Sequence, residues 1–170
     1  MMSERVLVAY ASKYGSTAEI AEAIGQAMQE AGLDVDVLSA DAVGDLAAYR
    51  AVVLGSAVYA GMWRKEAVKF LESREAELAQ RPVWLFSSGP TGEGDPVELL
   101  DGWRLPEAQQ AIADRISPRD IAVFHGNIDP EKLNLGEKLI VKAVKGKSGD
   151  SRDWDAIRNW ASHVASALSP

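Results

Sequence analysis

A hydroxyl-rich loop reads Ser12-Lys13-Tyr14-Gly15-Ser16-Thr17. It follows an apolar run at residues 6–10 and precedes a helical pattern that begins at Ala18. A buried strand, a short glycine-bearing loop and a helix suit a phosphate group, because the first N–H groups of the helix are unpaired and lie at the positive end of the helix dipole. The serine and threonine hydroxyls add donors, and Gly15 lets the backbone approach a ligand closely. The loop therefore predicts a phosphate-binding site.

The same residues also allow a purely structural interpretation. Ser16 and Glu19 fit a capping box, in which the serine hydroxyl and the glutamate carboxylate each accept a hydrogen bond from the other residue's backbone N–H. Such a box would start the helix without any ligand. The loop alone does not separate the two interpretations, so the rest of the chain has to decide between them.

Composition excludes several classes of function. With 170 residues, 47% of them hydrophobic, the chain can bury the core of one domain. Its net charge of −7 and its pI of about 4.9 argue against nucleic acid as a partner. The absence of cysteine excludes disulfides, thiol catalysis and iron–sulfur clusters, and the two histidines, His125 and His163, leave little for a metal site. No apolar run reaches the roughly 18 residues of a membrane span, so we expect a soluble, cytoplasmic protein.

Strand and helix patterns alternate along the chain. The predicted strands are residues 6–10, 33–38, 51–54, 82–86 and 121–124. The predicted helices are residues 18–31, 64–79, 106–116, 135–145 and 153–168. Strand 33–38 alternates apolar with acidic residues, which is typical of a half-exposed edge, whereas the strand at 51–54 is continuously apolar and therefore central. This alternation predicts one α/β domain with a parallel sheet covered by helices on both faces.

Two more loops lie where strands of such a sheet end. Residues 55–63 read Gly-Ser-Ala-Val-Tyr-Ala-Gly-Met-Trp after the third strand, and residues 87–92 read Ser-Ser-Gly-Pro-Thr-Gly after the fourth. Ligands of open parallel sheets bind at the carboxyl ends of the strands, so we expect all three loops to share one site. Backbone groups there would bind the polar edge of a flat heteroaromatic ring, and Tyr59 or Trp63 would cover one of its faces.

The three loops, in this order, resemble those of the flavodoxin fold. In that resemblance the loop at 12–17 corresponds to the one that holds the phosphate of FMN, and residues 57–62 and 88–92 correspond to the two loops at the flavin ring. The resemblance implies FMN as the cofactor and a three-layer fold with strand order 2-1-3-4-5. Tyr14 stands where the flavodoxin pattern has threonine, so one hydroxyl contact differs. The implied cofactor-binding residues are Ser12, Lys13, Tyr14, Gly15, Ser16, Thr17, Ala57, Val58, Tyr59, Ala60, Gly61, Ser88, Gly89 and Pro90.

A closer resemblance covers almost the whole chain. It is to the flavodoxin-domain family that includes menaquinone-dependent protoporphyrinogen dehydrogenase. The residues that carry it are Tyr-Ala-Gly-Met-Trp-Arg-Lys at 59–65, Arg-Asp-Ile-Ala-Val-Phe at 119–124, Lys-Leu-Ile-Val-Lys at 138–142 and Arg-Asp-Trp at 152–154. The resemblance implies an enzyme of haem biosynthesis that oxidises a porphyrin precursor and reduces a quinone.

The single flavodoxin-like domain would carry two additions, an irregular and helical segment at about 89–118 and an extra segment at about 126–150. Residues 131–152 contain six basic and three acidic residues, a local net charge of +3 in a protein of net charge −7. This reversal of charge fits a docking surface for a quinone, a porphyrin or an anionic membrane. In the last case, residues 135–147 would make a peripheral contact with the inner face of the membrane. The reversal also fits an ordinary surface helix with a solvated lysine face.

Two functions follow from these observations. The first is an FMN-dependent oxidoreductase that passes electrons from a reduced organic substrate to a quinone, in which the cofactor carries the redox chemistry and no catalytic acid, base or nucleophile is needed. The second is a flavodoxin-type carrier of single electrons, whose acidic surface would suit basic partner proteins. Roles for His125 and Trp103 beside the site stay open, and so does a homodimer.

Overall fold

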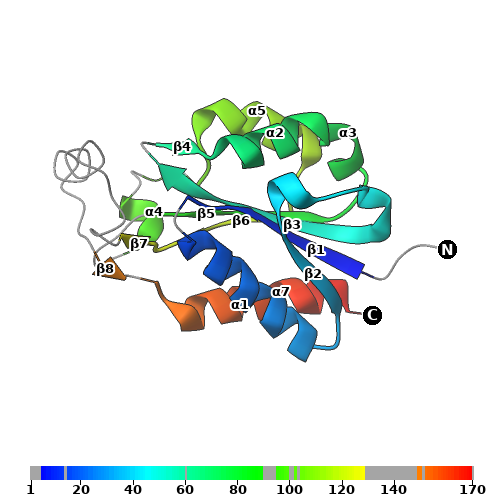
Figure 1. Ribbon diagram of the computed structural model, residues 1–170, viewed down its shortest axis with the longest axis horizontal. Coiled ribbons are helices and arrows are strands. Elements are labelled where there is room, and N and C mark those ends of the chain that lie inside the picture. Colours follow the sequence, from blue (N-terminus) through cyan, green and yellow to red (C-terminus); the bar gives the residue numbers. More distant parts are fainter. Residues whose placement is uncertain are drawn as a thin grey trace.

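The computed structural model describes residues 5–13, 15–59, 61–89, 95–99, 102, 104–128, 149–150 and 152–169. A parallel sheet lies at the centre, between two layers of helices (Figure 1). Its strands, in spatial order, are β2 (Asp34–Ser39), β1 (Arg5–Ala11), β3 (Tyr49–Tyr59), β5 (Val83–Ser88) and β6 (Asp120–Phe124). This is the predicted order 2-1-3-4-5, so the predicted fold class is confirmed, including the edge position of the strand at 34–39.

Helices cover both faces of the sheet (Figure 1). The first face carries α1 (Ser16–Glu30) and α7 (Trp154–Leu168). The opposite face carries α2 (Lys65–Ser73), α3 (Glu75–Leu78) and α5 (Glu107–Ile116). The short elements are the helix α4 (Pro96–Leu99) and the 3-10 turns η1 (Ala40–Ala42) and η2 (Leu46–Ala48). The helices thus seal the sheet from water on both sides and leave its ends for loops.

The central strands are buried on both faces because their side chains alternate between two apolar cores. Along β1, Leu7 and Ala9 pack into the core beneath α2, α3 and α5, whereas Val6 and Val8 pack into the core beneath α1 and α7. All four side chains are fully buried. This double burial explains the uninterrupted apolar run of the first strand, since successive residues of a strand point to opposite faces.

Phe86 of β5 lies across Gly55 of β3, its partner in the strand register. A Cβ atom at Gly55 would lie 2.0 Å from the ring of Phe86, so the ring occupies the space of a side chain at that position. Phe86 also contacts Phe124 and Trp160, with ring centroids 5.8 and 6.2 Å apart. The glycine is therefore required by close packing of the central strands.

Two predicted elements differ from their boundaries in the structure by more than a few residues. The third strand continues to Tyr59, because it pairs there with the antiparallel strand β4 (Met62–Trp63). The predicted helix at 64–79 is divided between α2 and α3 at Arg74, whose φ of −117° is not helical. Arg74 donates hydrogen bonds to the carbonyls of Gly44 at 2.7 Å and Val43 at 3.1 Å, and these contacts hold it toward the η1–η2 connection.

A short antiparallel ribbon follows β6 at the carboxyl end of the sheet. It consists of β7 (Asn127–Ile128) and β8 (Gly149–Asp150) (Figure 1). The predicted helix at 135–145 and the predicted membrane-contacting segment at 135–147 lie outside the described residues. Within the described ranges, no helix combines the length and the apolar composition needed to cross a membrane.

We expect Gly55→Ala to lower the free energy of unfolding by about 1–3 kcal/mol, since a methyl group there overlaps the buried ring of Phe86. Urea denaturation of the two proteins measures the loss. Gly44→Ala is the matched control, because no atom lies within 4 Å of the Cβ position at Gly44. Equal stability of the two variants would contradict the packing argument.

Candidate functional site

The carboxyl ends of four parallel strands lie in one row. Ala11 of β1 pairs with Ser56 of β3, and the next residue of β3, Ala57, pairs with Ser88 of β5. Ser88 in turn pairs with Phe124 of β6. The loops that follow these strands therefore start side by side, and the structure brings together the three loops that the sequence singled out.

The loop after β1 turns directly into α1. Gly15 is the N-cap of the helix and has a φ of +91°, which a residue with a Cβ atom adopts only with strain. Its backbone N–H donates to the Ser12 hydroxyl at 2.9 Å. Thr17 is 1% exposed, and Lys13 is exposed to solvent. Tyr14 lies outside the described residues, so its predicted contact stays a prediction.

Within the described part of the chain, the Ser16 hydroxyl has no hydrogen-bond partner, although its oxygen is buried. The capping-box interpretation is wrong. The N-cap is Gly15, Ser16 is already the first helical residue, and no side chain makes a capping hydrogen bond at this helix start in the described part of the chain. A buried hydroxyl without a partner costs roughly 1–3 kcal/mol. An anion at the start of α1 would supply the missing acceptor, and the unpaired N–H groups of the first turn would bind the same anion. The donor set therefore fits a phosphate group.

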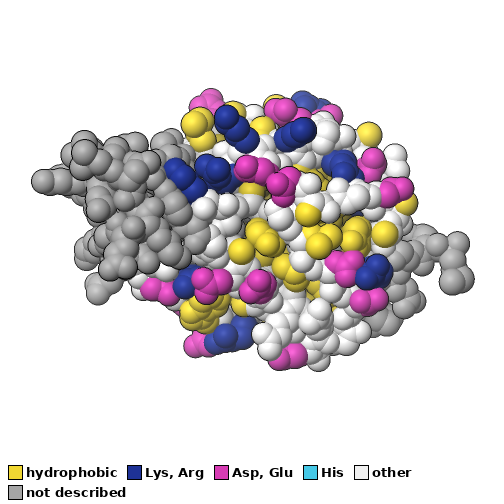
Figure 2. Space-filling model, in the orientation of Figure 1, with side chains coloured by type: hydrophobic (Ala, Val, Ile, Leu, Met, Phe, Trp, Pro, Cys, Tyr) yellow, Lys and Arg dark blue, Asp and Glu magenta, His cyan; other side chains and the backbone are white. Residues whose placement is uncertain are grey.

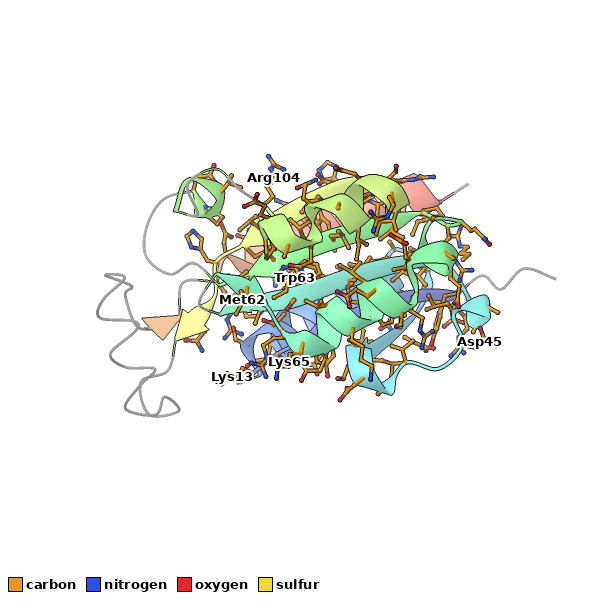
Figure 3. All side chains as sticks on the ribbon, turned by 90° about the horizontal axis from the view of Figure 1, so that it is seen from above. Lys13, Asp45, Met62, Trp63, Lys65 and Arg104 are labelled. Carbon is orange, nitrogen blue, oxygen red and sulfur yellow. The ribbon has the colours of Figure 1, made fainter. Side chains whose placement is uncertain are left out.

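The second loop forms the tip of the β3–β4 hairpin. Val58 pairs with Trp63 and Tyr59 with Met62, and Gly61 turns the chain with a φ of +76°. Met62 is 64% exposed, and Figure 3 shows it at the same end of the molecule as Lys13 and Lys65. Ala60 and the side chain of Tyr59 lie outside the described part of the chain. The hairpin thus presents backbone and one apolar side chain beside the start of α1.

Buried hydroxyl groups hold the hairpin in place. The fully buried Ser56 accepts a hydrogen bond from the backbone N–H of Arg64 at 2.9 Å. The indole N–H of Trp63 donates to the Ser87 hydroxyl at 2.9 Å, and that hydroxyl donates to the carbonyl of Arg104 at 2.9 Å. Trp63 is only 5% exposed, so this indole supports the hairpin from within the core.

The third loop packs backbone against backbone. A Cβ atom at Gly89 would lie 3.0 Å from the carbonyl oxygen of Val58, and one at Gly126 would lie 2.9 Å from Cα of Gly89. The N–H of Gly89 donates to the carbonyl of Phe124 at 3.2 Å. Pro90 lies outside the described residues. These close approaches join the loops after β3, β5 and β6 into one wall.

A hollow of about 460 Å³ opens beside the hairpin tip. The residues that line it are Gly61, Leu105, Pro106, Glu107 and Gln110. It lies between the second loop and the start of α5, and its volume falls in the range of small-molecule pockets. An organic molecule seated there would contact the hairpin that carries Met62.

Charged side chains surround the starts of the helices at this end of the sheet. Figure 2 shows Lys and Arg side chains near the start of α2, with acidic side chains close to them. Arg152, just before α7, is 6% exposed and contacts Asp150 and Glu19. The hydrogen bonds from Arg152 hold the pKa of the Asp150 carboxyl below its usual range. His125 lies at the carboxyl edge, next to the end of β6, and is half-buried.

Three residues that support the site were not predicted from the sequence. Ser56 and Ser87 looked like ordinary loop residues, and nothing in the pattern shows that both hydroxyls are buried acceptors. Arg152 was counted within the basic segment at 131–152 and among the residues that carry the closer resemblance, but no role at the start of α1 was predicted for it. A serine at the carboxyl end of a continuously apolar strand is the signal that would have drawn attention to the first two.

Residues 7–155 match the family described as "Flavodoxin domain". This match indicates FMN as the cofactor, and the partnerless hydroxyl of Ser16 fits its phosphate. A comparison with curated proteins gave no match.

Several solved structures share the fold. A flavodoxin from the domain Archaea is 18% identical, with a TM-score of 0.61 over 96% of this chain and 98% of that one. A flavodoxin from Streptococcus pneumonia TIGR4 is 18% identical, with a TM-score of 0.60 over 96% and 99%. The rubredoxin:oxygen oxidoreductase of Desulfovibrio gigas is 14% identical, with a TM-score of 0.62 over 98% of this chain and 36% of that one.

We expect Ser16→Ala to raise the FMN dissociation constant about tenfold or more, because a hydrogen bond to a charged group contributes roughly 1.5–3 kcal/mol. The apoprotein should lose no stability, since this hydroxyl has no partner among the residues that the structure describes. FMN fluorescence titration and urea denaturation of the apoprotein measure the two effects. Ser73→Ala, which removes an exposed hydroxyl bonded to the Lys69 carbonyl, is the control and should leave FMN affinity unchanged. A destabilised apoprotein with unchanged FMN affinity would refute this role.

Proposed function

The chain belongs to the flavodoxin domain family, and from that premise we propose that it is an FMN-dependent oxidoreductase that passes electrons from a reduced organic substrate to a quinone. The observation that carries the proposal is the meeting of three loops at one edge of the sheet, next to a helix start with a buried, partnerless hydroxyl. FMN, when bound, supplies the redox chemistry.

The chain's own residues would bind and orient the cofactor. The first turn of α1, with the hydroxyls of Ser12, Ser16 and Thr17, would hold the phosphate. The backbone of residues 57–61 and 88–90 would bind the polar edge of the ring. The hydrogen-bonded pair of Trp63 and Ser87 would keep the hairpin rigid, so that the ring is held in one orientation.

Two observations support an enzyme over a simple carrier. The hollow of about 460 Å³ at Gly61 adjoins the second loop and is large enough for a small organic molecule. The β7–β8 ribbon adds structure at the same end of the sheet (Figure 1). We propose protoporphyrinogen as the donor and menaquinone as the acceptor, on the strength of the sequence resemblance at 59–65, 119–124 and 152–154.

A second candidate is a carrier of single electrons between redox proteins. It is favoured by the similarity to flavodoxins over nearly the full length of both chains. The net charge of −7 would also suit docking to a basic partner protein. Reductive titration separates the candidates, because a carrier of single electrons should take up its two electrons in two well-resolved steps.

An anaerobic assay tests the enzyme directly. FMN-reconstituted protein is supplied with protoporphyrinogen and menadione, and porphyrin fluorescence is followed over time. We expect turnover that needs both FMN and menadione and that is lost in the double variant Ser12→Ala, Thr17→Ala, because FMN no longer binds. A yellow, fully reducible protein without turnover would refute the porphyrin assignment and favour the carrier. A protein that binds no FMN would refute both candidates.

A further inference from the structure

A buried guanidinium lies against the first turn of α1. Arg152 immediately precedes α7, yet its Nη1 lies 3.4 Å from the carbonyl oxygen of Ser16, which is 136 positions away in the sequence. Only 6% of its side chain is exposed. The ring of Trp154 lies beneath the guanidinium, with 4.6 Å between Cζ and the ring centroid. The side chain is therefore held on one side by an aromatic face and on the other by the helix that starts the phosphate site.

Two carboxylates flank this guanidinium. Asp150 accepts two hydrogen bonds from the guanidinium, from Nε at 2.9 Å and from Nη2 at 2.7 Å, and a third from the backbone N–H of Arg152 at 3.0 Å. Glu19, the acidic residue in the first turn of α1, lies 3.5 Å from Nη1. Figure 2 shows acidic and basic side chains side by side in the region between the starts of α1 and α7. The cluster thus links the end of β8 to the helix that carries Ser16.

The charges of this cluster bear on anion binding. The guanidinium and the two carboxylates carry a net charge of −1 together. Without the guanidinium of Arg152, the net charge of the cluster would be −2. A negative side chain in the first turn stabilises a helix through its dipole, but it also repels an anion at the same helix end. Arg152 offsets this repulsion, and because it is buried, water and salt screen it less than they screen a surface lysine.

We propose that Arg152 is a positioning residue for the phosphate end of the cofactor. It holds the first turn of α1 through the Ser16 carbonyl, and it neutralises carboxylates that would otherwise repel a phosphate dianion. The proposal rests on the assignment of FMN as the cofactor and goes beyond it, because Arg152 lies outside the three loops that the family resemblance implies. Its effect should be confined to ligands that carry a phosphate.

Riboflavin, which is FMN without the phosphate, makes this specificity measurable. We expect Arg152→Gln to raise the FMN dissociation constant about tenfold, the order expected for one unit charge near a bound anion. Its riboflavin dissociation constant should stay within about twofold of the wild-type value. Both constants come from flavin fluorescence titration of the apoprotein, with no activity assay involved.

A matched control and a rescue variant sharpen the test. Arg158→Gln also removes one positive charge, but this arginine lies on α7 in an exposed ion pair with Asp155. The variant should leave both dissociation constants unchanged. The double variant Arg152→Gln, Glu19→Gln restores the local charge to −1 and should recover FMN affinity to within about threefold of wild type. Glu19→Gln alone changes the local charge from −1 to 0 and should therefore bind FMN more tightly than wild type, with riboflavin binding unchanged.

The outcomes separate this proposal from the cofactor assignment. Wild-type protein that binds neither flavin would refute the assignment of FMN itself. Wild-type protein that binds FMN, with Arg152→Gln equally tight, would overturn the positioning role alone. Equal weakening of FMN and riboflavin would overturn it too, because a purely structural residue affects both ligands. If Arg152→Gln does not fold, Glu19→Gln still decides, since FMN binding in that variant that is no tighter than in wild type contradicts the charge argument.

Discussion

The parallel register of the central strands is the constraint on which the rest of the structure depends. It places Ala11, Ser56, Ser88 and Phe124 in one row, so that loops far apart in the sequence start next to one another. The register itself is held by strands that are buried on both faces, with Phe86 seated on Gly55 across two of them. Without that close packing the three loops would have no common wall to form a site.

Binding a phosphate is an electrostatic problem for this protein, because its net charge is −7. The groups that we propose for this task are local: the first N–H groups of α1, the Ser16 hydroxyl and the nearby Arg152. Their interactions act over a short range or in a buried position, so they would reach a bound anion without changing the acidic character of the surface. The surface remains available for electrostatic steering of a partner of opposite charge.

The flavin-ring end of the site relies on rigidity. The hairpin at 58–63 is fastened by buried hydrogen bonds to Ser56 and Ser87, and its backbone touches that of the next loop at Gly89. Buried, fully paired hydroxyls fix geometry because breaking one of these bonds leaves a partner unsatisfied. Met62, next to the turn of this hairpin, is an apolar side chain that stays exposed to solvent.

Hydrophobic periodicity and local loop chemistry were enough to predict the strands of the sheet, most of the helices that cover it and the three loops, because these properties depend on residues close together in the chain. The helix predicted at 18–31 is one example: α1 ends at Glu30, and Gly32 follows it with a φ of +98°. The order of the strands was implied by the resemblance to the flavodoxin fold, and the structure confirms it. The sequence did not reveal that Ser16 follows the N-cap, that Trp63 points into the core, or that Arg152 meets α1 across 136 positions. Those three facts depend on how packed elements orient their side chains, and only the tertiary structure decides that.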